Sequence, residues 1–145
     1  MEASVDRIES KLASYLSRCG DSVETIQFRR AYLRLVLQFK DELTASQLDG
    51  ALELQKCLRD EQYDRAVVDE LEESSRELLN QHLKNNASTT REALLNQLLF
   101  GALLESDDTD VFYVTEPMFL FARKMKVDVN ELEEILVSEF GELNA

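Results

Sequence analysis

The sequence predicts an all-α fold, a single-domain bundle of six or seven helices around a buried central helix at about residues 91–104. Three observations predict it. Apolar residues recur at steps of three and four along most of the chain, which is the spacing of one helix face. Ser, Thr, Asp and Asn stand where these segments begin, as helix caps do. The 145 residues include only 4 Gly and 1 Pro, so we expect few breaks and one domain over residues 1–145.

The first two predicted helices follow from their apolar stripes. The first spans about residues 4–19, and Gly20 is a natural stop because glycine readily adopts the left-handed conformation after a helix. The second begins with a cap at residue 21 or 22 and ends near residues 42–43. The apolar residues of the two stripes are Val5, Ile8, Leu12, Tyr15, Leu16 and Cys19, then Val23, Ile26, Tyr32, Leu33, Val36 and Phe39.

Thr44 begins the third predicted helix. Gln47 follows three residues later, which is the spacing of a capping box. The fourth and longest helix covers about residues 61–84. Its apolar stripe is interrupted by the polar residues 72–75, where we expect a kink, a break or an exposed turn.

The fifth predicted helix is the most apolar element of the chain. The fourth helix ends at residues 85–86, and Ser88 or Thr89 caps the next one. Residues 91–104 are apolar on nearly every side, which is typical of a helix buried in the centre of a domain.

The last third of the chain begins with an acidic loop at residues 105–110. Residues 111–114 are Val-Phe-Tyr-Val, the only segment with β character, and we expect them to be extended or one irregular turn. Thr115 then caps a sixth helix, with Pro117 in its first turn, and Asp128 caps a seventh.

The charge of the chain is strongly acidic and unevenly distributed. The net charge is −13, and all of it lies in residues 44–145, because residues 1–43 carry equal numbers of basic and acidic side chains. Binding to a nucleic-acid backbone or to an anionic membrane surface needs an excess of Lys and Arg. We therefore expect a protein partner and no direct contact with nucleic acid or membrane.

The cysteines and the beginning of the chain predict the compartment. Cys19 and Cys57 both lie on apolar stripes, which favours free thiols packed in the core over a disulfide framework. Glu2, Asp6 and Glu9 interrupt the apolar run that a signal peptide would need. We expect a cytoplasmic protein, with the nucleus as the alternative.

The residues of common catalytic and metal sites are scarce. His82 is the single histidine, and neither a nucleophile motif nor a glycine-rich phosphate loop is present. The acidic loop does not fit a calcium-binding loop that begins at Asp108, because Phe112 and Tyr113 stand where a ligand and a glycine are required. We expect no enzyme activity, no metal site and no cofactor.

An aromatic cluster near the sixth helix supplies the first candidate binding residues. Phe119 and Phe121 point about 200° apart on a helix, so one is expected to pack on the central helix. The other is either an exposed anchor for a partner or is also buried, because aromatic residues and Met are common in both places. The candidates of this cluster are Phe112, Tyr113, Met118, Phe119 and Phe121.

Two basic clusters stand against the acidic background. Arg30 and Arg34 share one face of the second predicted helix, and Arg123, Lys124 and Lys126 lie at the end of the sixth. Internal ion pairs and the helix dipole explain such clusters, and an anionic contact with a partner is the alternative. Arg30 and Arg34 complete the set of candidate binding residues.

The function predicted from these observations is that of a non-catalytic helical module for protein–protein interaction, such as an adaptor, assembly or regulatory subunit. It would act as a monomer or homodimer and bind an amphipathic helix or a basic surface through an apolar or aromatic groove. One alternative is an acidic inhibitor or nucleic-acid mimic that occupies a basic partner. The other is a ligand-sensing domain or an enzyme with a carboxylate site.

Overall fold

The computed structural model describes residues 3–19, 25–59, 62–86, 90–103 and 111–141, without the side chains of residues 3–4, 19, 25 and 111–116. Within these ranges the chain forms seven α-helices and one short 3-10 helix, with no strand, which confirms the all-α prediction. The α-helices are α1 (Ala3–Cys19), α2 (Thr25–Leu37), α3 (Ala45–Leu58), α4 (Arg65–Lys84), α5 (Arg91–Leu103), α6 (Val111–Lys124) and α7 (Val129–Phe140), and the 3-10 helix η2 spans Lys40–Glu42.

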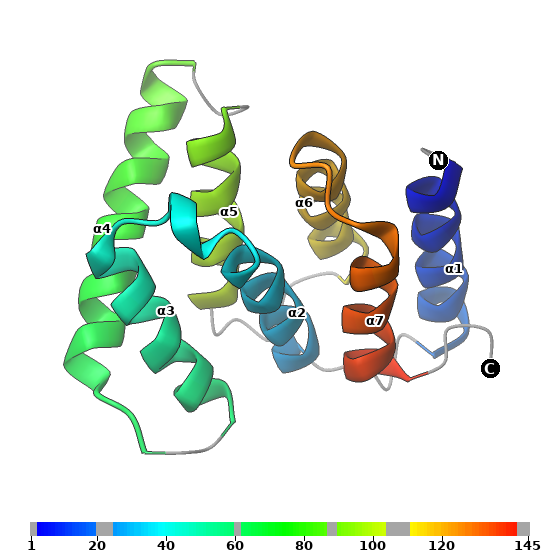
Figure 1. Ribbon diagram of the computed structural model, residues 1–145, viewed down its shortest axis with the longest axis horizontal. Coiled ribbons are helices and arrows are strands. Elements are labelled where there is room, and N and C mark those ends of the chain that lie inside the picture. Colours follow the sequence, from blue (N-terminus) through cyan, green and yellow to red (C-terminus); the bar gives the residue numbers. More distant parts are fainter. Residues whose placement is uncertain (1–2, 20–24, 60–61, 87–89, 104–110, 142–145) are drawn as a thin grey trace.

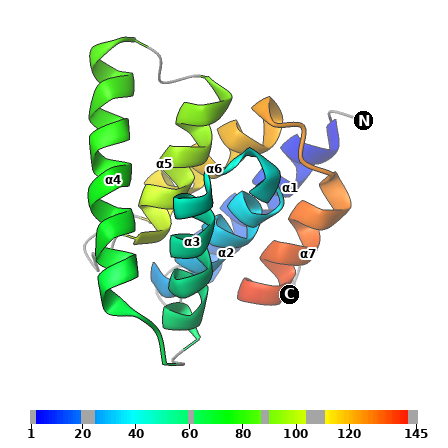
Figure 2. The ribbon, with the colours of Figure 1, turned by 60° about the vertical axis from the view of Figure 1, so that its left-hand side comes forward.

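Two helices occupy the centre of the bundle. Helix α5 lies between α4 and α6, and α2 lies between α3 and α7 (Figures 1 and 2). The predicted central helix is therefore confirmed, and it shares the centre with α2, on which it packs. Helix α1 packs against α6 and α7, so the first helix of the chain lies beside the last two.

Close packing of α5 on α2 depends on a glycine. A Cβ atom added at Gly101 would lie only 2.7 Å from Cε2 of Tyr32, so the ring occupies the space of the missing side chain. Gly50 plays the same part between α3 and α4, where an added Cβ would lie 2.8 Å from Cβ of Leu71. Both contacts are shorter than protein interiors allow, so alanine does not fit without a shift of the neighbouring helix.

Several predicted helix caps are confirmed. The Thr44 hydroxyl accepts a hydrogen bond from the Gln47 backbone N–H, while the Gln47 side chain accepts one from the Thr44 backbone N–H. Asp128 accepts hydrogen bonds from the first backbone N–H groups of α7. These bonds satisfy donors that have no partner inside their own helix.

The second helix is shorter than predicted. It ends at Leu37, and the chain then tightens into hydrogen bonds between residues three apart, Gln38 to Leu35 and Phe39 to Val36. Phe39 nevertheless packs on the core, where its ring meets that of Phe121 edge-on at 5.6 Å between centroids. The apolar pattern continued past residue 37 because Phe39 is partly buried against the core, although the chain there is no longer α-helical.

Of the kink, break or exposed turn predicted at residues 72–75, the break and the turn are wrong, because α4 continues as one helix from Arg65 to Lys84. Ser75 is buried against α5, and the Asn96 side-chain amide donates a hydrogen bond to the Ser75 carbonyl at 2.8 Å. Of these four polar residues, Ser75 marks a place where α4 and α5 contact each other through small and polar side chains, while Glu73 and Ser74 are exposed.

The expectation for residues 111–115 is also wrong. Val111 to Val114 begin α6, so Thr115 is not its cap, and Pro117 lies in the second turn. Propensities for β structure are weak and are often overridden by the packing of the whole helix.

Thr90 caps α5 by accepting a hydrogen bond from the Ala93 backbone N–H. The predictions for residues 20–22, 88–89 and 105–110 lie outside the described residues.

Candidate functional site

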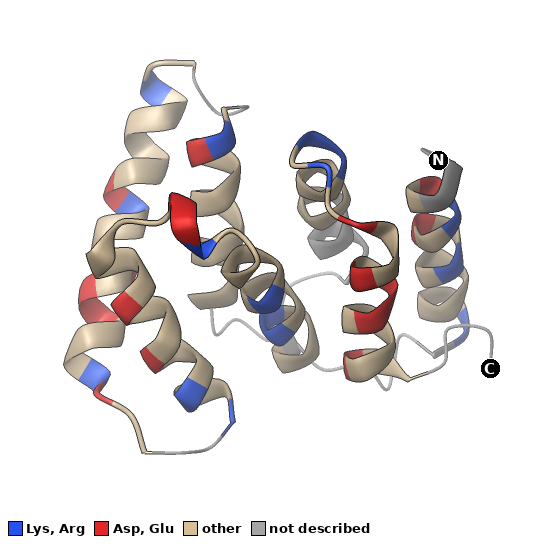
Figure 3. Ribbon diagram, in the orientation of Figure 1, with Lys and Arg blue, Asp and Glu red and all other residues tan. Residues whose placement is uncertain are grey.

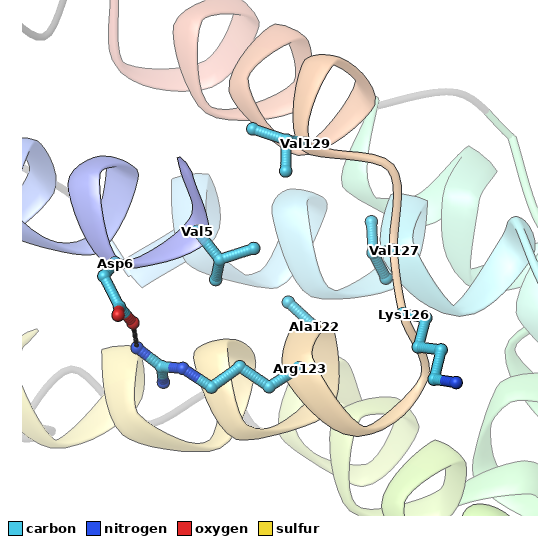
Figure 4. Close-up of a pocket in the computed structure, with 7 residues that line it drawn as sticks. All are labelled: Val5, Asp6, Ala122, Arg123, Lys126, Val127 and Val129. Atoms are coloured by element: carbon cyan, nitrogen blue, oxygen red, sulfur yellow. Dashed lines mark hydrogen bonds and ion pairs between the residues drawn. The ribbon is translucent and has the colours of Figure 1, made fainter. Parts of the chain in front are cut away.

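A cavity of about 540 Å³ lies where α1, α6 and α7 meet (Figure 4). It is bordered by the amino-terminal part of α1, the end of α6, the connection to α7 and the first residue of α7. We call it the valine pocket. The described residues that line it are Val5, Asp6, Ala122, Arg123, Lys126, Val127 and Val129.

The floor of the valine pocket is apolar. Val5, Ala122 and Val127 are buried, and Val129 is half-buried. Their side chains converge on one space from α1, α6 and the connection to α7 (Figure 4). Such a surface favours contact with an apolar group, because that contact removes the surrounding hydrocarbon from water.

The end of α6 determines where this floor lies. Lys126 adopts a left-handed conformation, with φ of 57°, and the Val127 backbone N–H donates to the Ala122 carbonyl at 3.0 Å. This is the pattern of a Schellman motif, in which the residue after the left-handed position packs back on the last helical turn. Val127 is thereby brought next to Ala122 on the pocket floor.

One edge of the pocket is closed by ion pairs. The Arg123 guanidinium pairs with Asp6 at 2.6 Å and also with Glu9, which connects α6 to α1. Hydrogen bonds with Glu9 and with Asp6 raise the pKa of Arg123. Lys126 also lines the pocket, its side chain extends away from the valines (Figure 4), and its ammonium forms no ion pair with any described residue.

The valine pocket offers an apolar surface and three charged side chains. Its titratable groups are Asp6, Arg123 and Lys126, and the first two already pair with each other. In the part of the chain that the structure describes, no group of three His, Cys, Asp or Glu is placed to hold a metal ion. An apolar floor with a free ammonium at its edge suits an apolar side chain that has a carboxylate beside it.

The predicted aromatic candidates lie mainly in the core. Met118, Phe119 and Phe121 are each 0% exposed, so both phenylalanines are buried, as in the second of the two alternatives. Helix α6 contacts α1 on one side and α5 and α2 on another, which covers opposite faces of the helix. The side chains of Phe112 and Tyr113 lie outside the described residues.

Among the described side chains of α6, the large apolar residue that is exposed is Leu120, with 46% of its surface accessible. The sequence did not single it out, because a leucine between two phenylalanines does not stand out in a helical pattern.

The burial of Val127, in contrast, could have been predicted from the sequence. Val127 precedes the cap Asp128, and Leu132 follows four residues after that cap, which is the spacing of a hydrophobic staple. That signal predicts burial of Val127, although not a cavity beside it.

The predicted basic candidates lie on α2 and face α3 and α7. Arg30 donates through Nε and Nη2 to the Leu58 carbonyl at 3.0 and 2.8 Å, at the end of α3. Arg30 and Arg34 each lie 4.0 Å from a carboxylate oxygen of Glu139. The internal interactions expected of this cluster are therefore present, most fully for Arg30.

No protein-family model matches this sequence, and no curated protein or solved structure shows significant similarity to it. Among the described helices, none has the length and the apolar character needed to cross a lipid bilayer.

Proposed function

We propose that this chain is a non-catalytic protein-interaction module, an adaptor, assembly or regulatory subunit, that binds its partner through the valine pocket. The observation that carries the proposal is the cavity of about 540 Å³ with an apolar floor and a free ammonium at its edge. Sites that hold ligand groups are commonly of this size, with apolar walls and few polar groups.

The partner group that fits is a large apolar side chain, such as Leu or Phe, with Asp or Glu nearby. The apolar side chain would contact Val5, Val127 and Val129, and the carboxylate would pair with Lys126. An amphipathic helix presents both groups together on one side. A few such buried contacts supply most of the binding energy in protein interfaces.

A blocking substitution tests the proposal. Val129→Arg places a long charged side chain in the lining of the pocket, on a half-buried residue at the beginning of α7. Val137→Arg is the matched control, because Val137 is also half-buried, lies on the same helix and does not line the pocket. Circular dichroism and thermal unfolding establish that both variants are folded.

The binding measurement uses short random peptides displayed on phage and selected against the wild-type chain. We expect the enriched peptides to share a large apolar residue next to Asp or Glu, to lose binding to Val129→Arg and to keep binding to Val137→Arg. The proposal is refuted if no peptide is enriched, or if the enriched peptides bind the blocked variant as well as the wild type.

No specific observation favours an acidic decoy or a carboxylate enzyme site. Several carboxylates already pair with cations of this chain, as in Glu42 with Arg91 and Glu72 with Arg76. Such pairs reduce the negative charge available to a basic partner.

A further inference from the structure

A groove that shares no residue with the valine pocket lies between α2, α3 and α7. It consists of a cavity of about 50 Å³ and a neighbouring cavity of about 260 Å³, and Arg34 and Gln55 line both. We call it the arginine groove. The described residues that complete it are Arg30, Leu33, Leu58, Arg59 and Glu139 in the smaller cavity, and Leu37, Gln38 and Ile135 in the larger.

The groove is basic although the chain is acidic. Helix α2 carries three arginines and no acidic residue. Basic residues of α2 lie between α3 and the acidic helix α7 (Figure 3). Among the described residues that line the smaller cavity, there are three guanidinium groups and one carboxylate, that of Glu139. Positive charge is therefore in local excess, and the Debye length of about 8 Å at physiological ionic strength limits the effect of distant carboxylates.

The three arginines differ in how fully they are used. Arg30 binds the Leu58 carbonyl through two of its N–H groups and so connects α2 to the end of α3. Arg34 lies 4.0 Å from Glu139, beyond hydrogen-bonding distance, and Arg59 forms no side-chain interaction with a described residue. Arg34 and Arg59 therefore bring unused hydrogen-bond donors to the same cavity.

The two cavities suit two neighbouring chemical groups. A volume of about 50 Å³ corresponds to a few water molecules, and a carboxylate occupies similar space. The planar fork of arginine binds carboxylates with two hydrogen bonds. The larger cavity has Leu37 and Ile135 in its lining, so it can receive an apolar side chain.

We infer that the arginine groove binds an acidic segment of a partner protein, in which a carboxylate contacts Arg34 and Arg59 and a neighbouring aliphatic side chain contacts Leu37 and Ile135. The inference shares with the proposed function the premise that this chain acts by binding protein, but the two sites have no residue in common. A nucleic acid fits less well, because the net charge is −13 and the lining of the larger cavity includes the apolar Leu37 and Ile135.

The test is fluorescence anisotropy with a short labelled peptide in which two glutamates flank a leucine and both termini are blocked. We expect the wild type to bind it, and Arg34→Gln to weaken binding at least tenfold, because a hydrogen-bonded charge pair is lost. Arg59→Gln should weaken it in the same direction. Lys84→Gln removes the same charge at the far end of α4 and should leave binding unchanged.

Four results would overturn the inference. One is no binding of the glutamate peptide by the wild type up to about 1 mM, the weak end of specific recognition. The second is equal binding of a peptide with glutamine in place of glutamate, and the third is equal binding of the glutamate peptide by Arg34→Gln. The fourth is tighter binding of a short single-stranded DNA than of the peptide. Val129→Arg should leave this binding intact, so failure here and failure of the valine pocket are distinguishable.

Discussion

Whether Gly101→Ala stabilises or destabilises the fold should depend on Tyr32, whose ring lies against Gly101. Replacing Gly101 with alanine within helix α5 should by itself favour the helix by up to about 1 kcal/mol. The added Cβ would lie 2.7 and 2.8 Å from Cε2 and Cδ2 of Tyr32. Those atoms must move by several tenths of an ångström in a buried contact between the two central helices. Overpacking of this kind costs about 1–3 kcal/mol.

The expected net effect of Gly101→Ala is therefore destabilisation by about 0–2 kcal/mol. In the Tyr32→Ala background the ring is absent, so only the helix preference remains, and the same substitution should stabilise by up to about 1 kcal/mol. Tyr32→Ala alone should cost about 3–5 kcal/mol, because it removes a buried aromatic side chain.

Urea unfolding of the four proteins, followed by circular dichroism, measures this cycle. In thermal unfolding, each kcal/mol corresponds to about 2–4 °C for a domain of this size. Stabilisation by Gly101→Ala in the wild-type background would refute the reasoning, and so would destabilisation of equal size in both backgrounds. Either result would mean that the ring does not occupy the space of the missing side chain.

Three further predictions concern stability. Thr44→Ala should lower the free energy of unfolding by about 1 kcal/mol, because a capping box is lost, while the neighbouring exposed Ser46→Ala should change it little; urea unfolding compares them. Tyr15→Phe should cost about 0.5–1.5 kcal/mol, because the hydroxyl donates to the Phe140 carbonyl at 2.9 Å, and an unchanged urea midpoint would contradict this. Burial raises the pKa of Glu139 above its ordinary value of 4.5, so the folded state holds that proton more tightly and loses stability as the pH rises through this pKa. Glu139→Gln should therefore gain stability relative to the wild type between about pH 4 and pH 7, and an equal difference at both values would contradict it.

Local features of the fold were predictable from the sequence. The capping box at Thr44 and Gln47 and the cap at Asp128 depend on side chains within three residues of the backbone groups that they bind. The burial of α5 follows from its composition alone, since no orientation of that helix avoids exposing apolar side chains.

Features that depend on a neighbouring helix were not predictable. The polar residues near Ser75 suggested a break, because the sequence does not show that Asn96 of another helix lies against them. The angle between Phe119 and Phe121 could be worked out, but whether both are buried depends on how many helices surround α6.

The valine pocket and the arginine groove were not predictable for the same reason, because each depends on how several helices pack together. The valine pocket is lined by Val5 and by residues more than a hundred positions later, so no local sequence pattern predicts it. The arginines of α2 did stand out in an acidic chain. Their shared cavity with Arg59 depends on where α3 ends.

The position of α1 beside α6 and α7 has a consequence for biosynthesis. The apolar stripe of α1, with Ile8 and Leu12 fully buried, is covered by helices that begin at residue 111. During translation these residues leave the ribosome before the two helices that cover them, which begin at residues 111 and 129. Contacts so distant in sequence form late, because a long loop must close before they are gained. Until then the first helix presents an uncovered apolar face, of the kind that chaperones bind.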